Sequence, residues 1–303
     1  MSFIELLTQM PALFTALALL VGLMVGSFLN VVIYRVPVML DREWREQCAE
    51  YAGETIEADR KPFNLIRPGS SCPACKASIR AWQNIPIVSY LMLRGRCAAC
   101  GASISIRYPI VEGLTALASA AVAWKFGFGA AAIAGLVLTW FLIALTFIDV
   151  DHQLLPDVLT LPLLWLGMTL SVLGGSFGLQ ATGAFAIPVD LRSSVIGAMA
   201  GYLSLWSIYH LFRLATGKEG MGYGDFKLLA ALGAWMGWKM LVPIVLISAA
   251  VGAVIGMTML AVQRRHRSTP IPFGPFLAIA GWLMLLFGPE LVGGYLGVFG
   301  PRL

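Results

Sequence analysis

The sequence predicts a polytopic α-helical membrane protein of about eight transmembrane helices, with a small zinc-stapled cytoplasmic domain between the first and second helices. The first observation is composition: 58% of the 303 residues are hydrophobic, 12% are charged and the mean hydropathy is +0.80. A soluble domain of this length could not cover so much apolar surface with polar groups. The second observation is a pair of Cys-x-x-Cys motifs inside the only extended polar region of the chain.

Uncharged apolar runs supply the predicted helices. Several runs are long enough for the roughly 20 residues that cross a bilayer. They cover residues 6–34, 126–148, 158–189, 193–212, 240–263 and 268–289. Two shorter runs are less regular: 108–124 contains Glu112 and 228–238 has only 11 residues, so each needs snorkelling ends, tilt or local bilayer thinning to cross. The first run follows Glu5 without a basic n-region, so we expect a retained helix rather than a cleaved signal peptide.

The basic residues predict the orientation. Residues 37–107 contain ten Lys and Arg, which places this segment in the cytoplasm by the positive-inside rule. With eight crossings, only four of the 21 Lys and Arg lie outside. They are Lys125, Arg192, Lys239 and Arg302. A re-entrant 228–238 would carry the basic cluster 264–267 to the outer face, so this run is predicted to be a short true span.

Three parts are therefore expected along the chain. Residues 1–36 form the first transmembrane helix, 37–107 a cytoplasmic zinc-binding domain and 108–303 the remaining membrane domain. The middle part has ten basic against seven acidic residues and is punctuated by Pro and Gly, which indicates a small loop-rich domain. This modest basic excess favours contact with anionic membrane lipid, and no nucleic-acid partner is expected.

Four of the five cysteines form the two pairs, Cys72 with Cys75 and Cys97 with Cys100. Paired knuckles at this spacing are typical of a structural zinc site, in which four thiolates leave no open position for catalysis. A small domain has a thin core and is stabilised by such a metal. The alternatives are metal-free thiols and two disulfides, and a reducing cytoplasm disfavours the disulfides. Cys48 lies outside the pattern and is expected to be an ordinary thiol.

Two aspartates, Asp149 and Asp225, stand where apolar runs should meet the cytoplasmic boundary. Carboxylates are costly near hydrocarbon, so we interpret both as functional. When two carboxylates share one proton, the ionised one can take a proton from water while the other donates to a substrate carbonyl or leaving amine. Asp225, near a helix N-terminus, also has a structural explanation, but Asp149 falls near a helix C-terminus, where the dipole disfavours an anion.

Other residues are predicted to support this pair. Gly222 and Gly224 would let backbone approach the site closely and adopt strained dihedrals before the helix that carries Asp225. Lys227 is interpreted either as a snorkelling anchor or as a cation that holds a carboxylate ionised. Glu112 could pair with a substrate amine or with a neighbouring arginine. Asp157 follows a proline and is predicted to begin a helix.

Composition alone leaves two other classes of protein open. An ion- or proton-coupled transporter would use Asp149 and Asp225 as relay residues, although both lie at the boundary rather than on paired interrupted helices near mid-membrane. A structural membrane component would use the zinc domain to recruit a cytoplasmic partner.

Nearly the whole chain closely resembles the type IV prepilin leader peptidases, which are membrane aspartic peptidases of the GxGD type. The resemblance rests on the motifs at residues 26–35, 84–86, 93–97, 107–109, 155–157 and 222–227, together with the four paired cysteines, Glu112 and Asp149.

This resemblance implies a bifunctional enzyme of the bacterial inner membrane with its active site facing the cytoplasm. Asp149 and Asp225 would cut the basic leader from prepilins and pseudopilins of type IV pilus and type II secretion systems, after a glycine. The new N-terminal residue would then be N-methylated with S-adenosylmethionine, a reaction linked to 37–107, while 108–303 would be the aspartic peptidase domain. No Gly-x-Gly-x-x-Gly fingerprint follows a strand, so no Rossmann-type site is expected and the methyl donor's residues are unassigned.

Overall fold

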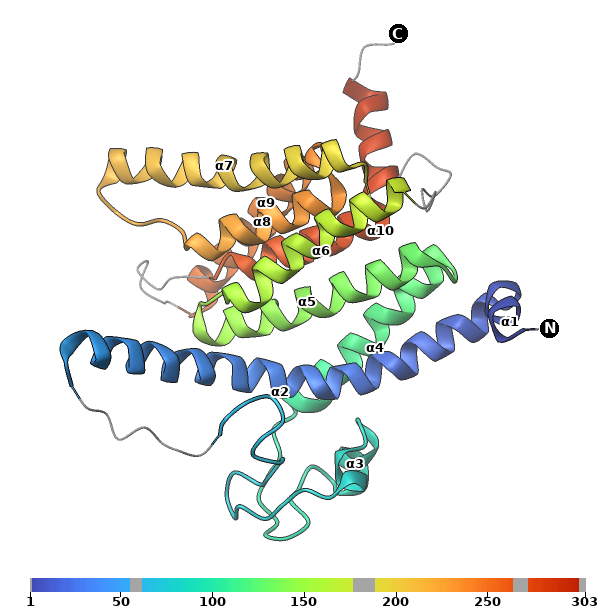
Figure 1. Cartoon of the computed structure of the whole chain (residues 1–303), viewed down its shortest axis with the longest axis vertical. Coiled ribbons are helices and arrows are strands. Elements are labelled where there is room, and N and C mark those ends of the chain that lie inside the picture. Colours follow the sequence, from blue (N-terminus) through green and yellow to red (C-terminus); the bar gives the residue numbers. More distant parts are fainter. Residues whose placement is uncertain (1, 55–61, 177–188, 264–271, 300–303) are drawn as a thin grey trace. The chain divides into compact units, whose positions relative to one another are not determined.

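The fold is almost entirely helical (Figure 1). It is a computed structural model that describes residues 2–54, 62–176, 189–263 and 272–299. The chain forms two compact units, Met1–Gly127 and Phe128–Leu303. Part of the predicted run 158–189 and all of the basic cluster 264–267 lie outside the described residues.

The first unit is built on two helices that pack against each other (Figure 1). The short α1 (Phe3–Gln9) leads into α2 (Pro11–Ala52), and α4 (Arg107–Phe126) packs on α2. The chain between α2 and α4 contains a 3-10 turn, η1 (Ala81–Asn84), and one short helix, α3 (Val88–Met92). The expected loop-rich segment is therefore present, but it starts later than predicted.

The later start reflects the length of α2, which is a single helix of 42 residues. We expected the span to end at residue 34 and a loop-rich domain to follow from 37, and for 37–52 this was wrong. Residues 38–52 contain neither Gly nor Pro and are rich in good helix formers, so the helix continues. It ends at Gly53, whose φ of 69° belongs to the left-handed region.

Small residues let α2 and α4 approach closely. A Cβ added to Gly26 would lie 2.7 Å from the Cα of Glu112, and one added to Gly22 would lie 2.8 Å from the Cα of Ala116. The side-chain amide of Asn30 donates to the carbonyl of Tyr108 at 3.2 Å, which fixes the start of α4 against α2. Close backbone packing of this kind holds helices together in membranes, where the hydrophobic effect does not drive their association.

At the centre of the second unit is a short helix, α8, which packs against α6, α7, α9 and α10 (Figure 1). Helix α5 packs on α10. Apart from Lys227, every residue from Asp225 to Met236 in α8 is buried. The elements of this unit are α5 (Ala130–His152), α6 (Asp157–Ser176), α7 (Leu191–Thr216), α8 (Tyr223–Met236), η2 (Trp238–Met240), α9 (Leu241–Gln263) and α10 (Gly274–Phe299).

Backbone meets backbone where α7 crosses α8. A Cβ built on Gly197 would overlap the carbonyl oxygen of Gly233, and a Cβ on Gly201 would lie 2.6 Å from the carbonyl oxygen of Leu229. On the other side of α8, the indole of Trp235 donates to the carbonyl of Leu163 in α6 at 2.8 Å. The central helix is therefore held on both flanks by contacts that leave little room for larger side chains.

Within the described residues, five helices are long and apolar enough to cross a membrane. They are Pro11–Ala52, Ala130–His152, Asp157–Gly174, Leu191–Thr216 and Trp238–Thr258. The predicted class, a helical membrane protein, agrees with this set. The count of eight spans remains a prediction. The domain limits at 36/37 and 107/108 also remain predictions, because the two compact units divide at a different place, after α4.

Candidate functional site

Asp149 lies in the last turn of α5 and is 5% exposed. The helix ends three residues later, where Gln153 adopts a φ of 52° and donates its amide to the Asp149 carbonyl at 2.8 Å. The Asp149 carboxylate accepts a hydrogen bond from the backbone amide of Gly274, the first residue of α10. The predicted position of Asp149 near a helix C-terminus is confirmed. The N-terminus of α10, not α5 itself, places the positive end of a helix dipole beside this carboxylate.

Asp225 lies in the first turn of α8 and is 6% exposed, which confirms the predicted helix start. Its carboxylate accepts a hydrogen bond from the backbone amide of Gly222. The expectation of strained glycines was wrong, because Gly222 is extended (φ −82°) and Gly224 is an ordinary residue of α8. Close approach is confirmed for Gly224, since a Cβ there would lie 2.6 Å from Cβ of Leu155.

The two carboxylates belong to one site, because Leu155 packs against Gly224, which precedes Asp225, and against Gly274, which lies against Oδ2 of Asp149. They come from helices whose facing ends are 76 positions apart in the sequence, and both are buried. Each is held by one backbone amide, so neither is neutralised by a basic side chain in the contacts of the described residues. The arrangement provides two acids that can divide one proton between them.

Gly274 was not predicted as a partner of Asp149. A Cβ at this position would lie 2.5 Å from Oδ2 of Asp149, so only glycine fits. A signal was present, because Gly274 stands between Pro272 and Pro275 at the start of an apolar run, and such a pattern is typical of a helix beginning. Nothing local, however, connects that turn to Asp149.

Lys227 binds Asp157 rather than either of the paired acids. Its Nζ lies 2.6 Å and 2.7 Å from the two carboxylate oxygens of Asp157. Asp157 is the first residue of α6, as predicted, so the ion pair joins the beginnings of α6 and α8. Both interpretations of Lys227, a snorkelling anchor and a cation that holds a carboxylate ionised, remain predictions.

Glu112 belongs to the first unit and is 7% exposed in α4. Its carboxylate accepts the backbone amide of Ile87 at 2.7 Å and a hydrogen bond from the Ser27 side chain. Ile87 has a φ of 57°, a strained value for a β-branched residue. Glu112 therefore fastens a strained turn of the loop-rich segment to α2 and α4, a role that its sequence context did not indicate.

The four paired cysteines converge in the first unit, with all sulfur atoms within 4.8 Å of one another. The sulfurs of Cys72 and Cys100 are 3.9 Å apart. A tetrahedral zinc with bonds of about 2.3 Å places its sulfur ligands about 3.8 Å apart, so the cluster fits this ion. The group is a candidate metal site made of Cys72, Cys75, Cys97 and Cys100.

Both cysteine pairs are formed by the same turn. Lys76 and Gly101 follow Cys72 and Cys97 by four positions, and both adopt left-handed backbone, with φ of 59° and 71°. Each donates its amide to the carbonyl of the leading cysteine at 2.9 Å. The repeated geometry points the two sulfurs of each pair to the same place.

The surroundings of the thiols differ. Backbone amides of Cys75 and Ala74 bond to the Cys72 sulfur and lower the pKa of that thiol to about 6. The backbone amide of Ala102 acts in the same direction on Cys100, but the neighbouring thiols, Cys75 first, together with burial raise the pKa of Cys100 to about 11. One thiolate is thus available near neutral pH, and a bound cation would displace the remaining protons.

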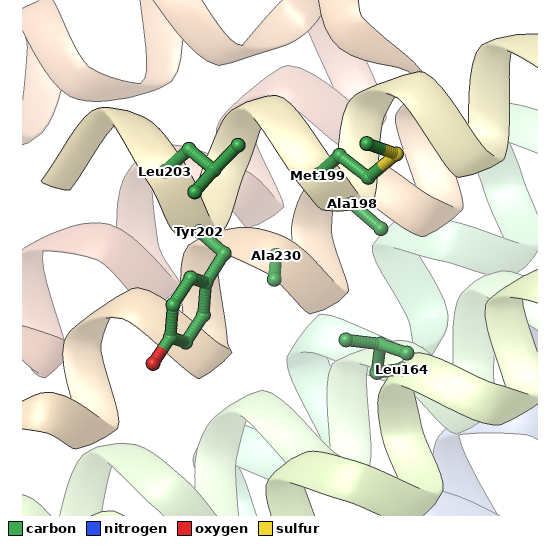
Figure 2. A pocket seen from close by; sticks show the side chains of 6 residues that line it. All are labelled: Leu164, Ala198, Met199, Tyr202, Leu203 and Ala230. Carbon is green, nitrogen blue, oxygen red and sulfur yellow. The ribbon is translucent and has the colours of Figure 1, made fainter. Parts of the chain in front are cut away.

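A separate apolar groove of about 420 Å³ lies where α6, α7 and α8 meet (Figure 2). Among the side chains that Figure 2 labels, Tyr202 alone carries an oxygen. The lining residues are Leu164, Ala198, Met199, Tyr202, Leu203 and Ala230. With no acid, amine or thiol in its lining, the groove contains no group that could activate water.

Comparisons with known proteins match both units. Residues 20–126 match the bacterial peptidase A24 N-terminal domain, and residues 136–257, which include Asp149 and Asp225, match the type IV leader peptidase family. The prepilin leader peptidase/N-methyltransferase of Stutzerimonas stutzeri is 54% identical over 98% of both chains. Proteins of the same name from Aeromonas hydrophila and Pseudomonas aeruginosa are 53% and 51% identical, again over 98% of both chains. No solved structure matches the chain. With identity this high over nearly its whole length, the chain belongs to the type IV leader peptidase family.

Proposed function

We propose that this protein removes the leader from prepilins and pseudopilins and then N-methylates the new N-terminal residue. The relatives named prepilin leader peptidase/N-methyltransferase support both activities. The observation that carries the cleavage reaction is the pair of buried, interacting carboxylates, Asp149 and Asp225. The transporter alternative is not favoured, because both family matches are to peptidase domains.

The two aspartates would activate water and the scissile bond together. The ionised carboxylate takes a proton from water as the water oxygen attacks the scissile carbonyl carbon, and the protonated carboxyl donates to the carbonyl oxygen. The carbon–nitrogen bond then breaks as the leaving nitrogen takes a proton, which frees a carboxyl group on the leader and an amine on the mature protein. Each acid accepts a hydrogen bond from one glycine amide, Asp149 from Gly274 and Asp225 from Gly222, which orients its carboxylate.

The released amine is the nucleophile of the second reaction, for which S-adenosylmethionine supplies the methyl group. The described residues contain only isolated β-bridges, Ser71 with Ser78 and Arg96 with Ser103, and no Rossmann-type sheet. We link this reaction to the segment 37–107, as the resemblance implies, and assign the methyl donor no residues.

We further propose that the protein crosses the bacterial inner membrane about eight times, with Asp149 and Asp225 at the cytoplasmic face. Helices α4, α8 and α10 would join the five long apolar helices. At 14 residues, α8 spans only about 21 Å. Its burial among the neighbouring helices supports a crossing that needs little contact with lipid.

The direct test combines the purified protein in liposomes with a prepilin-like substrate and labelled S-adenosylmethionine. We expect mass spectrometry to find the cut after the glycine and one methyl group on the new N-terminal residue. A substrate with that glycine replaced serves as the control and should stay intact. Failure to cut the intact substrate would overturn the proposal, and methylation without cutting would overturn the order of the two reactions.

We propose that the cysteine cluster holds a structural zinc ion. The fit of the four sulfurs to a tetrahedral ion supports this assignment, and so does the scarcity of secondary structure in residues 62–106, where the described elements are η1 and α3. The ion would supply no chemistry to catalysis, because four thiolates complete its coordination. It would hold the two knuckle turns together where the surrounding segment has almost no core of its own.

Replacing one ligand, Cys72→Ser, is therefore expected to remove most of the zinc and to expose the segment 62–106 to protease. Elemental analysis should fall from about one zinc per chain to a small fraction of that. Cys48→Ser is the matched control, because Cys48 is exposed on α2 outside the cluster, and it should retain the metal. Wild-type protein that contains no zinc, and whose protease resistance a chelator leaves unchanged, would contradict the assignment.

A further inference from the structure

We propose that Leu155, Asp157 and Lys227 form a clamp that sets the separation of the two catalytic aspartates. In this assignment they are positioning residues: Leu155 lies in the connection from α5 to α6, Asp157 is the first residue of α6, and Lys227 follows Asp225 in α8. The inference rests on the proposed role of the aspartates and goes beyond it, since it concerns how two separate helix ends are held in register.

Leu155 is the first part of the clamp. It is 7% exposed and lies between two glycines. A Cβ on Gly224 would lie 2.6 Å from Cβ of Leu155, and a Cβ on Gly274 would lie 3.0 Å from its Cδ1. Gly224 directly precedes Asp225, and the amide of Gly274 binds Asp149. One apolar side chain thus touches the backbone that carries one acid and the backbone that holds the other.

The ion pair between Lys227 and Asp157 is the second part. Both carboxylate oxygens of Asp157 lie within 2.7 Å of the Lys227 ammonium, and the side chains of Lys227 and Asp157 are 27% and 55% exposed. The pair of Arg45 and Asp41 is different, because it links neighbouring turns of one helix and its side chains are 74% and 55% exposed. An exposed pair within one helix contributes little, whereas a pair that joins the starts of two helices through a less exposed lysine can fix their relation.

These contacts define a positioning role rather than a chemical one. The ammonium group of Lys227 is directed to Asp157, and no contact of the described residues joins it to Asp225. Asp157 in turn begins the helix that directly follows the Asp149 turn. A shift of about 1 Å in the separation of reacting groups can lower a rate about 100-fold, so a device of this size can matter for catalysis.

The test measures leader cleavage by the full-length protein carrying Lys227→Met, Asp157→Asn or both. We expect each single change to lower kcat about 10- to 100-fold with KM unchanged, because substrate binding stays intact while the acids lose their register. The double variant should be no slower than the worse single variant, since both changes break one contact. Lys227→Arg should recover most of the activity, and Leu155→Ala should lower kcat in the same way.

Two controls separate this inference from the proposed function. Asp41→Asn removes an exposed ion pair and should leave kcat unchanged. Asp225→Asn must abolish cleavage, and if it does not, the proposed function fails rather than the clamp. Effects of Lys227→Met and Asp157→Asn that multiply in the double variant, a rise in KM alone, or normal kcat would each overturn the clamp.

A readout that does not depend on activity completes the test. Hydrogen exchange of the amides at 149–153 should quicken in Lys227→Met, although this segment is the last turn and C-cap of α5 and contains neither partner of the ion pair. Exchange confined to α6 and α8 would show that breaking the pair never reaches Asp149 and would also overturn the proposal. Melting temperatures close to that of the wild type would confirm that the variants fold.

Discussion

Leader cleavage is expected to fall about 1,000-fold or more in Asp149→Asn and in Asp225→Asn, because acid and base act as a unit and an amide can serve as neither. Both side chains are buried and nearly isosteric with asparagine, so the change removes ionisation with little effect on packing. Cleavage is measured by mass spectrometry on liposomes that contain each variant. Methylation of a pre-cut substrate should persist in both, since that reaction is assigned to another part of the chain.

The matched control is Asp151→Asn. Asp151 lies two positions beyond Asp149 at the same helix end but is exposed, so this variant should cleave at nearly the wild-type rate. If Asp149→Asn and Asp225→Asn both cleave normally, the catalytic pair is wrong and the carboxylates must serve structure or transport. Loss of methylation along with cleavage would instead show that the two reactions depend on one site.

Gly197→Ala is expected to cause the largest loss of stability. The added Cβ would overlap the Gly233 carbonyl oxygen and lie 2.8 Å from the carbonyl carbon, both of them backbone atoms of α8 that cannot rotate away. Overpacking of this kind costs about 3 kcal/mol, which corresponds to a fall in melting temperature of about 5–10 °C. Thermal unfolding in detergent measures it, and cleavage should decline too, because α8 carries Asp225.

Gly113→Ala provides the comparison. Gly113 is also inside a helix, but the nearest atom to an added Cβ is Cδ1 of Ile87 at 3.7 Å, an ordinary contact. Alanine should be neutral or slightly stabilising there, because glycine in a helix interior costs about 0.5–1 kcal/mol relative to alanine. Equal melting temperatures for Gly197→Ala and the wild type would show that α7 and α8 are not packed through their backbones.

The helical class and the two acids could be predicted because each leaves a local signal. Long apolar runs in a membrane protein require helices. A carboxylate such as Asp149 at the end of such a run is costly to hold near hydrocarbon, which indicates a functional role. The cysteine spacing likewise predicted the cluster that the structure brings together. In each case the informative residues were costly or unusual where they stood, so their positions could be read without knowing the fold.

The rest depended on contacts between distant segments. Gly274 holds Asp149, and Leu155 separates two glycines, but neither relation leaves a periodic or compositional trace. The strained backbone expected before Asp225 was wrong, because Gly224 is required by the bulk of Leu155 and not by its own dihedral angles. The segment 37–52 was predicted as loop because prolines and glycines punctuate the polar region as a whole. Residues 38–52 contain none of them, and the helix α2 continues through this segment.

The glycine contact between α7 and α8 is also expected to link the active site to the thickness of the membrane. Because backbone meets backbone at Gly197 and Gly233, the two helices should tilt together as one rigid body. The uncharged run 193–212 of α7 has 20 residues, about 30 Å of helix, and matches a hydrocarbon layer of about 30 Å, so its lean is expected to depend on the thickness of the bilayer. A thinner bilayer is expected to increase that lean, and α8 would convert the rotation into a change in the depth at which Asp225 meets its substrate.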